Sequence, residues 1–166
     1  MSIVRRLLLS LALFGLCLPL QATNVDMADH VVVRKSERRL YLMRGDETLR
    51  SFRVALGLDP VGHKEREGDF RTPEGRYRLT TRNPDSEFFL SIKVSYPSAA
   101  DTARAKKRGD PPGGYIMIHG QPNSPTYSRE YYRRMDWTDG CIAVSNADMI
   151  DIWMMTRADT PIEILP

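Results

Sequence analysis

The side chains of this sequence best suited to covalent chemistry are those of Cys141 and His119. A thiol becomes a useful nucleophile when a neighbouring base takes up its proton, and histidine is the usual base. Cys141 lies in the stretch DWTDGCIAV, and His119 ends the apolar stretch YIMI, at the rim of an expected strand. Gly140 permits unusual backbone angles, so the amides of Gly140 and Cys141 could stabilise an oxyanion. A thiol, an imidazole and these amides together predict nucleophilic attack on a carbonyl carbon, provided that two strand ends bring thiol and imidazole together.

The other cysteine, Cys17, lies in an N-terminal stretch with a basic start, an apolar run from Leu7 to Leu20 and then the small residue Ala22. This order predicts a secretory signal peptide over residues 1–22, cleaved after Ala22. The apolar run of fourteen residues is shorter than the roughly 20 that a membrane-spanning helix needs. An uncleaved N-terminal anchor is the alternative, because Leu20 is bulky for the position three before the cut. We therefore expect a periplasmic or secreted protein that has no membrane span after cleavage.

Cleavage would leave residues 23–166 as a single domain with one cysteine. On the count alone, Cys141 is a buried inert thiol, an intermolecular disulfide or a reactive nucleophile. The net charge of +3 includes Arg5 and Arg6 and would fall to +1, which argues against nucleic acid as a partner. One cysteine and scattered histidines match no zinc-ligand spacing, so we expect no metal and no cofactor. His30 and His63 are expected to face solvent without a catalytic role.

Alternating apolar residues predict a mainly β domain with one or two short helices. Strands are expected within 31–33, 40–43, 52–56, 75–82, 88–97, 113–120, 142–144 and 161–165. Residues 127–135 could form a short helix, and 145–157 form the clearest one, with Ser145 as N-cap and Asp148 in the first turn. Residues 103–114, ARAKKRGDPPGG, are expected to be a basic surface loop or a mobile flap over a site for acidic substrate.

Two motifs together resemble a known family. The sequence IHG is followed, after a tyrosine-rich insertion, by TDGCIAVSN, and GDFRTPEGRYRL contains a Thr-Pro-x-Gly turn before a strand. Both features are similar to those of the L,D-transpeptidase catalytic domain family (YkuD-type), and the resemblance extends from Val31 to Leu165. It implies an L,D-transpeptidase-like β-sandwich or barrel for residues 23–166. Within the family, the chain looks most like the periplasmic single-domain subgroup.

The resemblance also implies roles for individual residues. Cys141 matches the family's nucleophile, His119 its general base, and Gly140 the glycine whose backbone lines the oxyanion hole with Cys141. The implied reaction is acyl transfer on peptidoglycan stem peptides through a thioester on Cys141. Its products would be crosslinks between stem peptides or a protein attached to the wall. A hydrolase on the same scaffold, acting as an L,D-carboxypeptidase, endopeptidase or amidase, is the close alternative, and a non-catalytic wall-binding module is the second.

Residues next to the motifs are candidates for substrate binding. Tyr115 alternates with Met117 and His119, which would place the three on one face of a strand. Trp137, Thr138 and Asp139 directly precede the Gly-Cys pair. Asp139 departs from the family pattern, in which histidine or arginine is common at this position. Ala143 also departs, because many members have arginine there, and the interval of 22 positions from the histidine to the cysteine is slightly longer than usual.

Overall fold

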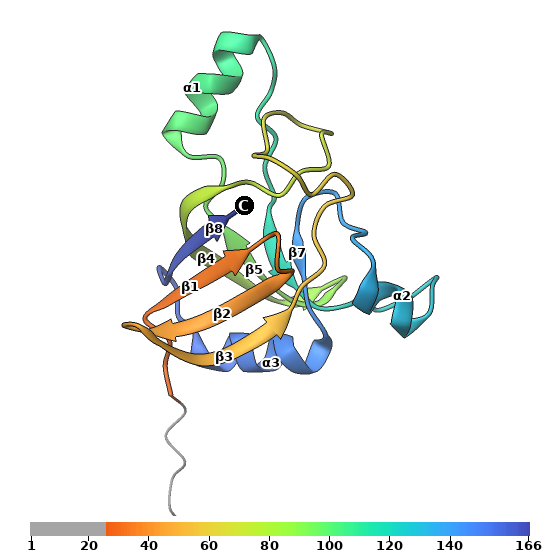
Figure 1. Ribbon diagram of the computed structural model, residues 1–166. Coiled ribbons are helices and arrows are strands. Elements are labelled where there is room, and N and C mark those ends of the chain that lie inside the picture. The colour runs from red at the N-terminus through yellow and green to blue at the C-terminus, as the bar shows by residue number, and fades with distance from the viewer. Residues whose placement is uncertain (1–25) are drawn as a thin grey trace, which may run out of the picture.

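The computed structural model of the chain describes residues 26–166 (Figure 1). The expected signal peptide over residues 1–22, and Cys17 with it, lie outside the described residues. Within residues 26–166, eight strands and three short helices follow one another. They are β1 (His30–Arg34), β2 (Arg39–Arg44), β3 (Glu47–Arg53), β4 (Gly75–Ser86), β5 (Phe89–Val94), α1 (Ala99–Arg108), β6 (Met117–His119), α2 (Arg129–Arg134), β7 (Ile142–Ala143), α3 (Asn146–Met155) and β8 (Pro161–Leu165).

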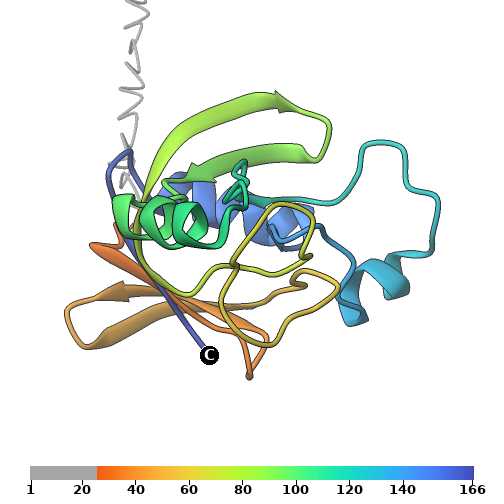
Figure 2. The same cartoon turned by 90° about the horizontal axis from the view of Figure 1, so that it is seen from above.

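The strands form one sheet in the order β3-β2-β1-β8-β4-β5-β6-β7. The chain beyond β3 then meets the last strand, because Ala55 and Ala143 exchange two backbone hydrogen bonds of 2.8 Å each. The sheet therefore curls until its two ends touch, and a view from above shows β1–β3 and the β4–β5 hairpin on opposite sides of the molecule (Figure 2). The predicted mainly β, barrel-like fold is confirmed.

The core follows from alternation along the strands. In β2, Leu40 and Leu42 are fully buried while Arg39 and Arg44 are exposed, as a period of two requires. The same pattern buries Ile162 and Ile164 in β8. These four strand positions match the predicted apolar runs, and their side chains belong to one continuous hydrophobic cluster.

Helix α3 packs against β5. It begins after Ser145, whose hydroxyl accepts the backbone amide of Asp148 at 3.1 Å, as the sequence predicted. The side chains of Met149 and Ile152, which belong to this helix, are buried. No helix among residues 26–166 is both long and apolar enough to cross a bilayer.

Residues 99–108 form a helix, α1, where the sequence had predicted a loop beginning at residue 103. Ser98 and Asp101 form a reciprocal capping box, and Gly109 ends the helix with a left-handed φ of 82°. Only Asp101 and Ala105 of this helix are buried. Because α1 has almost no apolar face, hydrophobic periodicity could not indicate it. Residues 26–166 therefore contain three helices instead of the expected one or two.

Candidate active site

His119 and Cys141 line one cavity of about 520 Å³. His119 ends β6, and Cys141 directly precedes β7. The two strands pair in parallel, with Ile118 opposite Ile142. The sequence could not show that these strands are neighbours. Their pairing brings the Cys141 thiol and the His119 imidazole to the same end of the sheet.

His119 is held by a backbone carbonyl and two aromatic rings. Its Nδ1 donates to the Gly120 carbonyl at 2.7 Å, and a carbonyl only accepts, so the proton of the neutral ring lies on Nδ1 and Nε2 is left as a base. Phe88 and Trp137 lie beside the ring, with centroid distances of 4.6 and 5.7 Å. Burial lowers the pKa of His119 to about 4, against the smaller raising effect of the Gly120 contact. The resting imidazole is therefore neutral.

The thiol of Cys141 is also in its neutral form. Sγ donates to the backbone carbonyl of Tyr115 at 3.5 Å. Burial raises the pKa of Cys141, and the carboxylate of Asp139 raises it further, while the backbone of Met117 and the Lys64 ammonium act in the opposite direction. The resting pair is thus a neutral thiol and a neutral imidazole.

The turn before Cys141 is held by the Thr138 side chain. Thr138 Oγ1 donates to the Cys141 carbonyl at 2.8 Å and accepts the Gly140 amide at 3.1 Å. These bonds revise two predicted roles. The buried Thr138 hydroxyl shapes the turn, and the Gly140 amide is engaged by it, so Gly140 does not offer an oxyanion-hole donor in this structure. The Cys141 amide makes no hydrogen bond within residues 26–166 and is the donor that can serve an oxyanion.

Gly140 is required for close approach of the backbone. Its φ is +125°, and a Cβ built there would lie 2.6 Å from the Arg71 carbonyl oxygen. Gly57 is also closely packed, because a Cβ built there would lie 2.0 Å from the Phe70 carbonyl oxygen and 3.1 Å from Gly140 Cα. Thr72, the first residue of the Thr-Pro-x-Gly sequence, accepts the Gly57 amide at 3.2 Å. The Thr-Pro-x-Gly motif therefore packs directly against the turn formed by residues 138–141, which we call the catalytic turn.

The other predicted substrate-binding residues also line the cavity of His119 and Cys141. Asp139 is exposed, and no bond links it to His119, as expected for a solvent-facing carboxylate. Tyr115 is not in a strand, because β6 begins at Met117, so the alternation argument for it was wrong. Its φ is 55°, its side chain is 78% exposed, and the Lys93 ammonium lies 5.3 Å from the ring centre.

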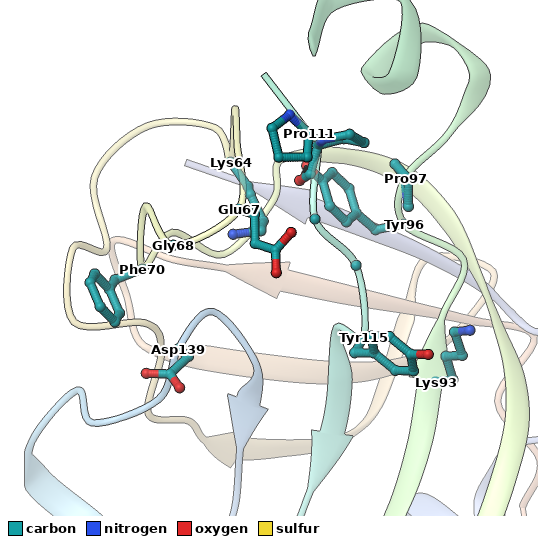
Figure 3. Close-up of a pocket in the computed structure, with 13 residues that line it drawn as sticks. Lys64, Glu67, Gly68, Phe70, Lys93, Tyr96, Pro97, Pro111, Tyr115 and Asp139 are labelled. Atoms are coloured by element: carbon teal, nitrogen blue, oxygen red, sulfur yellow. Dashed lines mark hydrogen bonds between the residues drawn. The ribbon is translucent and has the colours of Figure 1, made fainter. Parts of the chain in front are cut away.

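A second cavity of about 750 Å³ adjoins the first and shares Gly114, Tyr115 and Asp139 with it. Figure 3 shows Lys64, Phe70 and Lys93 around it, from the loop after β3 and from β5. Sequence reasoning missed these residues and Phe88. Phe70 lies in the stretch GDFRTPEGRYRL, but outside its Thr-Pro-x-Gly turn, and the others belong to no motif, so only the fold brings them to the site.

The two remaining histidines lie outside both cavities. His30 contacts Asp29 at 2.5 Å near the surface. His63 is half-buried, which corrects the prediction that it faces solvent: its Nδ1 accepts the Glu74 amide at 3.0 Å, and its Nε2 lies 3.2 Å from Asp101. It ties the loop after β3 to α1 and has a structural role.

Comparison with known proteins agrees with this geometry. The model of the L,D-transpeptidase catalytic domain, YkuD, matches residues 28–164. The chain belongs to this family. YafK of Escherichia coli K12, described as a candidate L,D-transpeptidase, is 33% identical over 97 residues, which cover 55% of this chain and 37% of YafK.

Solved structures share the fold. Pgp2 of Campylobacter jejuni, described as a helical cell shape determining protein, matches 81% of this chain and 46% of its own with 25% identity and a TM-score of 0.61. The L,D-transpeptidase of Mycobacterium smegmatis matches 82% of this chain and 58% of its own with 15% identity and a TM-score of 0.56. The chain thus spans less than half the length of YafK and of Pgp2.

Proposed function

We propose that the protein carries out cysteine-dependent acyl transfer on peptidoglycan stem peptides in the bacterial cell envelope, through a thioester on Cys141. One observation carries the proposal. In a domain of the L,D-transpeptidase family, the thiol of Cys141 and the free Nε2 of a buried, neutral His119 share one cavity.

The reaction begins when substrate enters and the thiol leaves the Tyr115 carbonyl. Nε2 of His119 takes the proton of Cys141 as Sγ attacks the carbonyl carbon of the third stem-peptide residue. The Cys141 amide stabilises the oxyanion, and loss of such a donor typically costs ~3 kcal/mol. The carbon–nitrogen bond then breaks, D-alanine leaves with the proton from His119, and the thioester remains.

The second half-reaction requires an acceptor. An amine of another stem peptide, or of a wall-attached protein, attacks the thioester carbonyl and gives a proton to Nε2 of His119. The carbon–sulfur bond then breaks, and the Cys141 thiolate takes this proton, which restores the resting thiol and neutral imidazole. The second cavity beyond Tyr115 offers space for one of the two chains, while the first holds the reacting carbonyl. Pgp2 is described as a protein that determines cell shape, which supports a function in wall remodelling.

A hydrolase is the second candidate function. Both cavities open to solvent, and Asp139, at their shared border, is exposed. Water that reaches the thioester would release a shortened stem peptide in place of a crosslink. The same residues would act in both reactions, and the outcome depends on whether an amine or water reaches the thioester first.

The test is incubation of the purified protein with tetrapeptide muropeptides and separation of the products by mass. Crosslinked dimers indicate transpeptidation, shortened monomers indicate hydrolysis, and unchanged substrate with active-site thiol intact would support a non-catalytic wall-binding module. The Cys141→Ala variant should give unchanged substrate. A stable adduct on Cys141, seen as a mass increase of the native protein, would directly identify the thioester.

A further inference from the structure

A row of arginines crosses the first three strands on their outer face. Arg34 of β1 pairs in register with Arg39 of β2, and Arg39 pairs with Arg53 of β3. Directly paired residues point to the same face of a sheet. All three are exposed, and Leu40, the neighbour of Arg39 along β2, is buried, so the row faces solvent.

Helix α2 extends this row. Arg53 Nε donates to the Arg133 carbonyl at 2.9 Å, and Arg53, Arg133 and Arg134 together line a hollow in the surface. Figure 1 shows β3 running toward the side of the molecule on which α2 lies. We refer to Arg34, Arg39, Arg53, Arg133 and Arg134 as the arginine surface.

Clustering of positive charges lowers the stability of the folded protein. Like charges directly opposite each other on neighbouring strands are destabilising, and residues 26–166 carry a net charge of only +1, because Arg5 and Arg6 are the sole charged residues before Asp26. Glu37 and Glu130 pair with arginines of this surface, which leaves an excess of three positive charges. General basicity of the protein therefore does not explain the cluster, whereas binding of an anion would.

The groups around the arginines favour an acidic polymer over a lipid surface. Guanidinium groups match the geometry of carboxylates. Beside Arg34, a hollow of about 260 Å³ is lined by Val32, Tyr41 and Met43, with Thr48 and the Glu37 carboxylate that pairs with Arg34. Its apolar part suits a sugar ring or an aliphatic side chain. In residues 26–166, no exposed large apolar side chain belongs to β1, β2 or β3, so the strands of this face lack the groups that insert into a bilayer; beside α2, Met135 alone follows the arginines and is exposed.

The arginine surface begins next to the catalytic turn. Arg53 is two residues before Ala55, and Ala55 is bonded to Ala143, two residues after Cys141. A polymer bound along this face would thus extend past the cavity that contains Cys141.

We propose that the arginine surface binds the carboxylate-bearing peptidoglycan polymer outside the catalytic cavities and holds the wall while one stem peptide reacts at Cys141. The identity of the polymer rests on the proposed function; the anion binding does not. Because the contacts are exposed ion pairs, binding should weaken as salt is raised.

The experiment is co-sedimentation of the full protein with purified sacculi at low and physiological salt. The test variant is Arg39→Gln with Arg134→Gln, since neither side chain holds a backbone group in place. The control is Lys106→Gln with Lys107→Gln, which removes the same charge from exposed positions on α1. We expect about tenfold weaker binding for the test variant, from two lost ion pairs, and native binding for the control.

Turnover of soluble muropeptides is measured in parallel and should be unchanged in both variants. Equal loss of sacculus binding in test and control variants would overturn the proposal, as would native binding by the test variant. Arginine-dependent sedimentation with phosphatidylglycerol vesicles but not with sacculi would overturn it in favour of a lipid surface. If native protein turns over no muropeptide, yet sacculus binding depends on the arginines, the proposed function fails and the arginine surface stands.

Discussion

The buried imidazole of His119 makes the protein sensitive to acid. Its pKa is about 4 in the folded protein and about 6.5 in an unfolded chain. Between these pH values the unfolded state binds more protons than the folded state. The contribution of the neutral His119 to the free energy of unfolding is therefore fully present above pH 6.5, and about 3 kcal/mol of it is lost as the pH decreases toward 4. We predict that His119→Asn, which keeps a donor for the Gly120 carbonyl, shows a flatter decline between pH 7 and 5. Urea unfolding at several pH values measures it, and equal slopes for both proteins would contradict the assigned burial effect.

Cys141 and Asp139 provide a second prediction at this scale. A cysteine next to a histidine is expected, from that pairing alone, to form a stabilised thiolate and to be alkylated faster than a free cysteine at neutral pH. Because burial and Asp139 raise the pKa of Cys141, we now predict slower alkylation at pH 7 than for the unfolded protein, with a rise at alkaline pH. Asp139→Asn should shift this profile toward lower pH, and muropeptide turnover should hold or rise slightly. Alkylation by iodoacetamide, followed by mass, measures both. An unshifted profile with lost turnover would mean that Asp139 acts on substrate instead.

The element that positions the nucleophile is the four-residue turn from Thr138 to Cys141. Thr138→Val keeps the shape of the side chain but removes both hydrogen bonds of the hydroxyl, at a cost of about 1–3 kcal/mol for the unsatisfied groups. We predict reduced kcat with little change in KM, since the turn holds Sγ and the Cys141 amide rather than the substrate. Thr138→Ser keeps the hydroxyl and should restore kcat. If valine instead raised KM alone, Thr138 would contact substrate, as the sequence first suggested.

Secondary structure was predictable where burial alternates and was missed where it does not. The strand PIEIL was placed at its observed bounds of 161–165, because Ile162 and Ile164 both face the core. Helix α1 was missed, because polar groups fix its position: the Asp101 carboxylate accepts from Ser98 and from the Tyr77 hydroxyl at 3.1 Å. The Tyr77 contact joins residues far apart in the sequence, and no local pattern indicates it. The Ser98–Asp101 capping box is a local signal, but no apolar periodicity follows it to mark a helix.

At the scale of the whole molecule, an irregular connection positions the site. Residues 54–74, between β3 and β4, contain no named helix or strand, yet Gly57 and Arg71 pack against the catalytic turn. The motifs predicted that His119 and Cys141 lie together, and both line one cavity; that they react stays a prediction. The cavity walls were not predictable, because Lys64, Phe70 and Phe88 reach the site only after the sheet has curled and this connection has folded over it.

One buried lysine fixes that connection to the first strands. Lys35, at the turn after β1, is 2% exposed, and its ammonium donates to the carbonyls of Gly62 and Thr72 and to the Glu74 carboxylate at 2.5, 3.0 and 2.8 Å. Lys35→Met would leave these acceptors without their donor, and removal of one partner of a buried ion pair costs about 3 kcal/mol or more. Because Thr72 lies one residue after the carbonyl that contacts Gly140, we predict that turnover at Cys141 also falls.

The matched control is Leu79→Ala, which destabilises the core by a similar 2–5 kcal/mol from a fully buried position in β4. Turnover is measured where each variant is still folded, and hydrogen exchange is followed over residues 62–74. We expect faster exchange there and lower turnover for Lys35→Met only, since the core substitution leaves the three acceptors paired. Equal turnover of the two variants would show that the site tolerates a loosened connection, and that the catalytic turn is held by the Thr138 hydroxyl and the Ala55–Ala143 contact alone.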